Sequence, residues 1–260
     1  MEFFKLRQRI HDRTRPPLVI FPITLADPAI VEIAGYAGAE AVLLDCEHGS
    51  INPQAIRAMI SAAAAAGTAA VYRPRSFDAA ACRQALDAGA AGCHVSHVDT
   101  AEQARAAVDA CRYAPLGRRE MSLGRAVHYI RENLKPYVQQ ANDDQLLVVM
   151  IETIKAVENV DAIAAVPGID VLHIGAADLS HDMGHVCEYD TPRFQDAVDK
   201  VLAAAQNNGI TAGFPTDDPD LVADLTRKGM RFFEADTPDW LLREVYADRL
   251  AALNAVFKKL

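Results

Sequence analysis

The sequence predicts an α/β protein folded as a (β/α)8 barrel. Short apolar runs rich in Val, Ile and Leu alternate with longer helical patterns eight times along the chain. Such sustained alternation indicates a parallel sheet, and the continuous apolar strands indicate that both faces of the sheet are covered. Eight units in 260 residues match the size of a closed barrel. An open, doubly wound sheet is the alternative, although no glycine-rich dinucleotide motif follows the first strand.

The elements follow in order along the chain. Strands are expected at 17–24, 40–48, 69–74, 92–98, 146–153, 170–180, 210–216 and 231–237. Helices are expected at 27–38, 52–67, 76–89, 100–115, 154–168, 193–209 and 218–229, with an extra C-terminal helix at 238–260. Asn52 is a candidate N-cap because Pro53 suits the first helical position.

Residues 116–145 interrupt the alternation and are expected near the barrel's rim, as a functional loop or as a surface excursion. No linker or low-complexity tract divides the sequence. Residues 1–260 are therefore expected to form a single domain.

Composition limits the partners and the compartment. A net charge of -9 disfavours nucleic acid and anionic membranes as partners. Five cysteines without a C-x-x-C pair indicate a reducing compartment. The first 17 residues, MEFFKLRQRIHDRTRPP, lack the apolar segment of a signal peptide, and the run AMISAAAAAGTAAVY is too short to span a bilayer. We expect a cytoplasmic protein with no nucleic-acid or membrane partner.

Polar side chains follow several of the expected strands. Barrel enzymes carry their active-site groups at the C-terminal ends of the strands, so we expect these side chains to meet at one rim. They are Asp45, Glu47 and His48 after the second strand, Arg73 after the third, Ser96 and His97 after the fourth, Glu152 after the fifth and Asp178 after the sixth.

Glu152 and Asp178 come from neighbouring strand ends. Two carboxylates placed side by side repel each other unless a cation lies between them. Oxygen ligands of this kind suit a hard divalent ion such as Mg2+ or Mn2+. The alternative is that each acid only stabilises the N-terminus of a helix.

His48 is a candidate general base, which Asp45 or Glu47 could orient; a structural histidine is the alternative. Arg73 could bind a substrate carboxylate or stabilise an oxyanion; a salt bridge at the rim is its alternative, and Arg75 competes for the role. The remaining candidates are interpreted as core or rim residues: His94, His97, His173 and the five cysteines. Met150 is interpreted as core packing or pocket lining.

Several stretches resemble a known family: LLDCEHG, YRP, ALDAGAAG, VDTAEQARAAVDACRYAPLGRR and IETIKAVENVDAIAAVPGIDVLHIGAADLS. In order and spacing they are similar to the pyruvate-dependent class II aldolases, the 4-hydroxy-2-oxoheptanedioate aldolase and citrate lyase-like group of phosphoenolpyruvate/pyruvate barrels. The resemblance covers Ile20 to Arg249. It implies a (β/α)8 barrel assembled as a homohexamer, with the last helix exchanged between neighbours.

The resemblance also implies a reaction. A 4-hydroxy-2-oxo acid would be cleaved reversibly to pyruvate and an aldehyde through a metal-bound enolate, with Mg2+, Mn2+ or Co2+ as the cofactor and a small oxo acid as the substrate. The residues it implies are His48, Arg73, Asp45 and Asp87 for catalysis, Arg73, Met150, Ala177 and Asp178 for substrate binding, and Glu152 and Asp178 for the metal. Asp87 would support the base across a subunit boundary.

The chain departs from the family pattern around this set. Met150 stands where a glutamine is common, Ala176 and Ser96 replace prolines, Glu120 replaces a glycine, and the first strand's loop lacks its usual tryptophan. The alternative function is therefore a carbon–carbon bond-forming synthase, such as a citrate synthase of siderophore biosynthesis acting on oxaloacetate. Its polyanionic product could be bound by Arg75, Arg118 and Arg119. A third hypothesis, a non-catalytic binding protein, predicts a broken set of acids and histidine, which here is whole.

Overall fold

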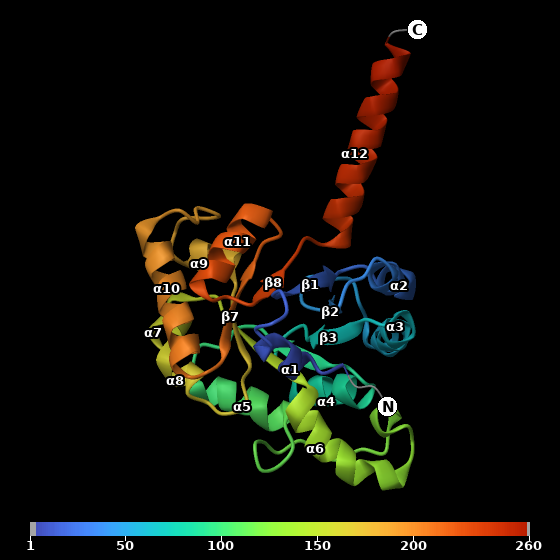
Figure 1. The fold of residues 1–260 in the computed structure, drawn as a ribbon, viewed down its shortest axis with the longest axis vertical. Helices are drawn as coiled ribbons and strands as arrows, with labels where there is room; N and C mark the ends of the chain where they lie inside the picture. Colours follow the sequence, from blue (N-terminus) through green and yellow to red (C-terminus); the bar gives the residue numbers. More distant parts are fainter. Residues whose placement is uncertain (1–3, 259–260) are drawn as a thin grey trace.

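A computed structural model, which describes residues 4–258, shows a closed barrel of eight parallel strands surrounded by helices (Figure 1). The strands pair in chain order from β1 to β8, and β8 pairs with β1 to close the ring. The predicted (β/α)8 barrel is confirmed, and the open sheet is wrong.

The bounds of the elements are as follows. The strands are β1 Leu18–Ile23, β2 Ala41–Asp45, β3 Ala69–Arg73, β4 Gly92–Val95, β5 Leu146–Ile151, β6 Val171–Ile174, β7 Thr211–Pro215 and β8 Phe232–Glu234. The helices are α1 Leu6–His11, α2 Pro28–Tyr36, α3 Pro53–Ala66, α4 Ala79–Asp87, α5 Ala101–Cys111, α6 Leu134–Asp144, α7 Ile154–Glu158, α8 Val160–Ala164, α9 Ala176–Asp182, α10 Pro192–Asn207, α11 Pro219–Lys228 and α12 Pro238–Phe257. Two short 3-10 helices, η1 Arg125–Val127 and η2 Arg131–Asn133, precede α6.

Three expectations about the elements need correction. The strand expected at 170–180 ends at Ile174, and α9 begins two residues later because good helix formers follow Gly175. The helix expected at 154–168 is divided at Asn159 into α7 and α8. Helix α1 was not expected. The Asn52 cap is confirmed, since its side chain accepts the backbone N–H of Ala55.

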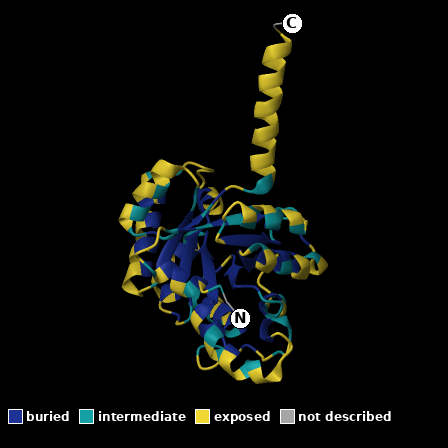
Figure 2. Cartoon of the chain, turned by 45° about the vertical axis from the view of Figure 1, so that its right-hand side comes forward, coloured by how far each residue is buried: buried dark blue, intermediate teal, exposed yellow. Residues whose placement is uncertain are grey.

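Helix α1 closes the N-terminal end of the barrel. Leu6 and Ile10 are buried in an apolar cluster with strand residues that include Leu43 and Val71. Figure 2 shows the buried strands at the centre, with helices around them that expose their outer faces. Because apolar side chains fill this half of the interior, polar groups are confined to the other half.

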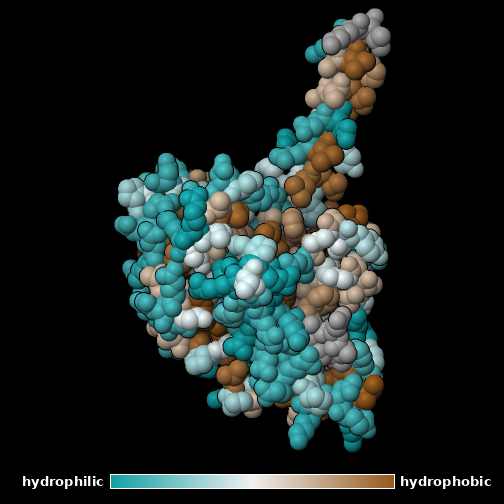
Figure 3. Space-filling view, in the orientation of Figure 1, coloured by the Kyte–Doolittle hydropathy of each residue, from teal (hydrophilic) through white to brown (hydrophobic). Residues whose placement is uncertain are grey.

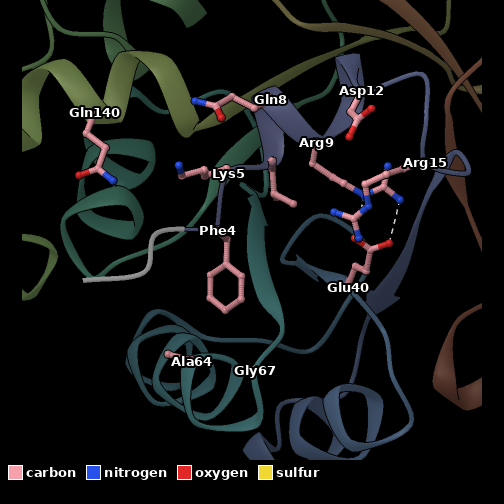
Figure 4. Close-up of a pocket in the computed structure, with 11 residues that line it drawn as sticks. Phe4, Lys5, Gln8, Arg9, Asp12, Arg15, Glu40, Ala64, Gly67 and Gln140 are labelled. Carbon is pink, nitrogen blue, oxygen red and sulfur yellow. Dashed lines mark hydrogen bonds and ion pairs between the residues drawn. The ribbon is translucent and has the colours of Figure 1, made fainter.

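A cleft of about 1070 Å³ opens beside α1 (Figure 4). In it the buried Arg9 donates two hydrogen bonds to Glu40, of 2.7 and 2.8 Å, and Arg15 donates a third of 3.0 Å. Glu40 directly precedes β2, so the cleft lies at the end of the barrel where the strands begin. This is the stability face of such barrels rather than the catalytic face.

The insertion at 116–145 lies at this same N-terminal end. Helix α6 packs against α1, and Gln8 donates to Asp144 at 2.9 Å. A segment that joins the end of one helix to the start of the next strand must lie where strands begin. The insertion is therefore at the rim opposite to the strand ends that carry the candidate residues.

The expected C-terminal helix is present as α12, and residues 259–260 lie outside the described residues. Every residue from Asp239 to Phe257 is exposed, and the helix projects away from the barrel with apolar side chains along it (Figures 1 and 3). At its start Thr24 donates to Asp239 at 2.7 Å. Within residues 4–258, no helix is long and apolar enough to cross a membrane.

Candidate active site

Asp45 and Arg73 form a buried ion pair where β2 and β3 end. The register of the two strands puts these residues directly opposite each other. Arg73 donates from Nε and Nη2 to the two carboxylate oxygens of Asp45, at 2.9 and 2.7 Å. Asp45 also accepts the backbone N–H groups of Glu47 and His48, at 2.9 and 3.3 Å. Asp45 thus holds both the guanidinium and the loop that carries His48.

The pair is ionised. Burial disfavours the Asp45 carboxylate, but the hydrogen bonds and charge of Arg73 outweigh burial and hold the pKa of Asp45 below its usual value. Burial likewise disfavours the Arg73 cation, but Asp45 and the nearby acids raise the pKa of Arg73. A guanidinium held in this way keeps its charge and its orientation.

Glu47 lies between three side chains of the same mouth. Ser96 donates to its Oε2 at 2.6 Å, and His97 Nε2 lies 3.4 Å from its Oε1. The side chain of His48 is 64% exposed, with Nε2 at 3.7 Å from Glu47 Oε2. Two accessible imidazoles therefore reach one carboxylate, and His97 is at the mouth rather than in the core.

Glu152 is buried just after β5 and accepts the backbone N–H of His97. Burial raises the pKa of Glu152, the N–H and ring of His97 partly oppose this, and the charges of Glu47 and Asp178 raise it further. Asp178 lies in the first turn of α9. The two predicted metal ligands are therefore close enough to repel each other.

The surroundings of Glu152 fit a hard divalent ion. A Cβ on Gly175 would lie 2.5 Å from Glu152 Cβ and 2.9 Å from its Oε2, so only glycine leaves room for this carboxylate. Carboxylate oxygens are the ligands that Mg2+ and Mn2+ prefer. A cation between Glu152 and Asp178 would offset the burial that chiefly raises the pKa of Glu152 and the smaller repulsion by Asp178.

Met150 is buried beside Arg73. Its Sδ accepts a weak hydrogen bond from Arg73 Nη1 at 3.7 Å and lies 3.4 Å from Ser96 Oγ, whose proton goes to Glu47. A thioether offers no donor to a ligand, so this wall of the mouth is less polar than an amide would make it. Ala177 is exposed in the first turn of α9, next to Asp178.

Asp87 is not brought to this mouth. It ends α4, where it accepts a hydrogen bond from the buried Arg119 at 2.7 Å, beside a cavity of about 520 Å³. Arg118 is exposed and pairs with Asp109. Arg118 and Arg119 therefore lie away from the mouth, and only Arg75, which follows β3, remains near it among the three arginines proposed for a polyanionic product.

A largely buried acid beneath Arg73 was not predicted from the sequence. Glu234, at the end of β8, has its Oε1 3.9 Å from Arg73 Nη1, and its Oε2 faces His94 and His173. Burial raises the pKa of Glu234 to about 7. The available signal was the alternation in RFFEADT, which puts Glu234 on the same side of β8 as Phe232.

The family model that describes the HpcH/HpaI aldolase/citrate lyase group matches residues 19–235. The chain belongs to this family. The resemblance seen in the sequence is thereby confirmed, and a non-catalytic binding protein is disfavoured. The chain is 38% identical over 195 residues to 4-hydroxy-4-methyl-2-oxoglutarate aldolase of Chaetomium globosum, covering 73% of this chain and 71% of that one.

A second relative is 2-keto-3-deoxy-L-rhamnonate aldolase of Salmonella paratyphi B, 35% identical over 229 residues, which cover 87% of this chain and 85% of that one. Both relatives are named aldolases, so the HpcH/HpaI chain is a carbon–carbon lyase by its family.

Solved structures agree with the barrel. The HpcH/HpaI aldolase of Desulfitobacterium hafniense superposes with a TM-score of 0.88 at 28% identity, over 97% of both chains. Citrate synthase SbnG superposes equally well, with a TM-score of 0.88 over 98% of this chain and 99% of that one. At 24% identity, the similarity to citrate synthase SbnG supports the fold alone.

Proposed function

We propose that this HpcH/HpaI enzyme is a class II pyruvate aldolase. It reversibly cleaves a 4-hydroxy-2-oxo acid to pyruvate and an aldehyde, with a divalent ion such as Mg2+, Mn2+ or Co2+ as its cofactor. The observation that carries this proposal is the Asp45–Arg73 ion pair beside the Glu152 and Asp178 carboxylates at one barrel mouth. A fixed cation and a set of oxygen ligands at one place suit a reaction that develops negative charge on an oxo acid.

Glu152 and Asp178 would hold the ion. When bound, a divalent ion supplies positive charge that stabilises the oxygens of the oxo acid as the enolate forms. The raised pKa of Glu152 supports this assignment, because a nearby cation would offset both the burial and the charge of Asp178.

Arg73 stabilises the enolate oxygen. Asp45 takes the Nε N–H and one N–H of Nη2, which leaves the second N–H of Nη2 and both of Nη1 to donate; the neighbours of Nη1 are Met150 Sδ at 3.7 Å and Glu234 Oε1 at 3.9 Å. Because Asp45 fixes the guanidinium before the substrate arrives, little reorganisation is needed as charge develops. Met150, Ala177 and Asp178 form the rest of the substrate-binding surface.

His48 moves the proton. It removes the proton of the 4-hydroxyl, directly or through a water; the C3–C4 bond breaks, the aldehyde leaves, and the enolate takes a proton at C3 to give pyruvate. The two imidazoles are almost equally exposed, but His48 Nε2 lies 3.7 Å from its nearest carboxylate oxygen, on Glu47, whereas His97 Nδ1 lies 3.2 Å from Glu152. Asp87 of a neighbouring subunit would act as a positioning residue for His48.

Helix α12 supports a proposed homohexamer in which this helix is exchanged between neighbours. Its exposed apolar side chains are Trp240, Leu241, Leu242, Val245, Tyr246, Leu250, Leu253, Val256 and Phe257. Beside its first turn lies an apolar cavity of about 310 Å³ lined by residues that include Phe21, Ile30 and Ile33. We propose further that residues 1–260 act as one domain in the cytoplasm.

A citrate-forming synthase that acts on oxaloacetate is the second candidate. Met150 favours it, because it changes the wall of the mouth relative to the family pattern, and the exposed Arg75 could bind a polyanionic product there. The positions of Arg118 and Arg119 disfavour it, because neither can meet a product at this mouth.

A cleavage assay tests the proposed function. Metal-stripped protein is mixed with 4-hydroxy-2-oxo acids, including those named for the two relatives, and pyruvate release is followed with and without Mn2+. We expect release that requires the ion, is lost in Glu152→Gln and persists in the matched control Glu158→Gln, an exposed acid of α7. Citrate formation from oxaloacetate and acetyl-CoA, with no pyruvate release from any substrate, would replace the proposal with the synthase.

A further inference from the structure

Three side chains meet inside the barrel, one layer below Arg73. They are His94 of β4, His173 of β6 and Glu234 of β8, and alternate strands of a barrel contribute to the same interior layer. One possible ligand atom from each lies within 4.8 Å of the other two. The two imidazoles are fully buried, and the Glu234 side chain is 12% exposed.

These groups are not satisfied by one another. Within residues 4–258, no hydrogen-bond partner is present for either ring nitrogen of His94, for His173 Nδ1 or for Glu234 Oε2. Glu234 Oε2 lies 3.8 Å from His94 Nδ1 and 3.6 Å from His173 Nε2, beyond hydrogen-bond length. A buried polar group that is left unpaired destabilises the folded protein. Something that contacts all three side chains would remove this cost.

The spacing suits a small transition-metal ion. With metal–nitrogen bonds of about 2.0–2.1 Å, neighbouring ligand atoms of a tetrahedral site lie about 3.4 Å apart. The two distances to Glu234 exceed this by a few tenths of an ångström. Two imidazoles and one carboxylate also form a common zinc set, in which water takes the fourth position.

The barrel is built to hold these rings. A Cβ on Gly213 would lie 2.9 Å from His173 Nδ1, so glycine leaves room for this imidazole. The Phe232 ring packs edge-on against both imidazoles, with centroids at 5.3 Å from His173 and 6.3 Å from His94. The rings are therefore held in place before any ion binds.

The charges above the cluster act in both directions: in addition to burial, Arg73 lowers the pKa of both imidazoles and so opposes a cation, whereas the acids around it favour one. Arg73 is the cation that faces Asp45, Glu47 and Glu234, and Glu152 adds a further carboxylate nearby. Glu234 has its Oε1 toward Arg73 and its Oε2 toward the imidazoles, so an ion can take Oε2 while Oε1 still faces the guanidinium.

We propose that His94, His173 and Glu234 form a second metal site for a divalent transition ion such as Zn2+, beneath the catalytic mouth. Its nitrogen-containing ligand set distinguishes it from the all-oxygen pair of Glu152 and Asp178, which suits Mg2+ or Mn2+. The site goes beyond the proposed aldolase activity and does not depend on it.

Titration of metal-stripped, full-length protein with Co2+ tests this site by visible absorption. Four-coordinate cobalt with nitrogen ligands absorbs far more strongly than six-coordinate cobalt bound by oxygen. We expect an intense spectrum that saturates at one Co2+ per chain and that Zn2+ displaces. Glu152→Gln should keep this spectrum. The spectrum therefore detects the second site independently of the metal site at the mouth and of enzymatic activity.

Variants of the three ligands complete the test. His173→Phe should abolish the intense spectrum, and Glu234→Gln, which keeps the shape of the side chain, should weaken Co2+ binding at least tenfold. Far-UV circular dichroism checks that each variant is folded, and Glu188→Gln, an exposed acid of the loop after α9, is the matched control. Absence of the intense spectrum with folded wild-type protein, or its persistence in both ligand variants, would overturn the proposal and leave a protonated Glu234 to explain the cluster.

Discussion

Arg73 depends on Asp45 for its orientation, since two hydrogen bonds of 2.9 and 2.7 Å fix its guanidinium in a buried place. A lysine could supply the charge but not this planar, two-point contact. The same Asp45 carboxylate also fixes the loop that carries His48. One acid therefore positions two of the groups assigned to catalysis.

Asp45→Asn should destabilise the protein by about 3 kcal/mol near pH 7, because it leaves a buried guanidinium without its main partner. Urea unfolding of wild type and variant measures the difference. The pKa of Asp45 is lowered in the folded protein, so its stabilising contribution is present above its ordinary value of 3.8 and is lost as pH falls through the folded pKa. The difference should therefore shrink in acid; a difference that widens on acidification would contradict this account of the pair.

His48 and His97 compete for the role of base. His48→Ala should lower turnover by about 10²–10⁴-fold, the usual contribution of general acid–base catalysis, while the protein stays folded. His97→Ala should weaken metal binding more than turnover at saturating ion, because His97 contacts Glu152. Steady-state kinetics at several Mn2+ concentrations separates the two. An active His48→Ala with an inactive His97→Ala would transfer the role to His97.

The sequence alone predicted which side chains meet where barrel topology determines their position. Asp45, Arg73 and Glu152 were expected together because parallel strands end at one rim, and the structure brings them there. Glu234 was not recognised, because the alternation in RFFEADT puts it on the same side of β8 as Phe232 but does not show which side of so short a strand faces the interior. Likewise, the hydrophobic pattern of the strands does not show that His94 and His173, on two strands that are not neighbours, lie close together inside the barrel.

The junction of β6 and α9 shows how an element shapes the site. Gly175, the N-cap of α9, lies against Glu152, and a Cβ added to Gly175 would lie 2.5 Å from Glu152 Cβ. Helix α9 then begins at once and presents Asp178 in its first turn. The predicted strand extended through this turn because VLHIGAADLS is largely apolar. Gly175 is required by its contact with Glu152, which follows β5. A contact between segments distant in the sequence cannot be seen in a local sequence pattern.

Gly175→Ala should displace Glu152, weaken metal affinity about 10–100-fold and destabilise the protein by about 1–3 kcal/mol through overpacking. Ala203→Gly, at an exposed position of α10, is a control with a similar stability cost of about 1 kcal/mol and no contact with the site. Calorimetry of Mn2+ binding and thermal unfolding measure both effects. Equal metal affinities for the two variants would refute the role given to Gly175.

Helix α12 should join subunits. A chain that ends at Asp236 should keep its barrel, since Asp239 to Phe257 are exposed, but should lose its assembly. Light scattering should give a mass well above one chain for the full protein and a lower mass for the truncated one, with Leu250→Asp giving an intermediate effect. A full-length protein that is monomeric would contradict the exchanged helix.

At the scale of the whole molecule, the barrel interior divides into an apolar half at the N-terminal end and an ionisable half at the mouth. Apolar residues and α1 fill the N-terminal end of the barrel, so a ligand meets the polar groups from the other end. The eight-fold alternation of the sequence predicted this architecture, because strand–helix repeats leave few closed solutions. The place of Asp87 in an assembled enzyme could not be predicted, because it depends on a second chain.

Exchange of the methyl protons of pyruvate with D2O, followed by NMR, tests the central claim most directly. Metal-stripped protein should catalyse no exchange; Mg2+ should restore it, and His48→Ala should not respond to the ion. This result would establish that the protein forms the enolate of pyruvate and needs a divalent ion to do so. Absence of exchange from folded wild-type protein with Mg2+, Mn2+ and Co2+ alike would contradict the account, because pyruvate would then not be the nucleophile.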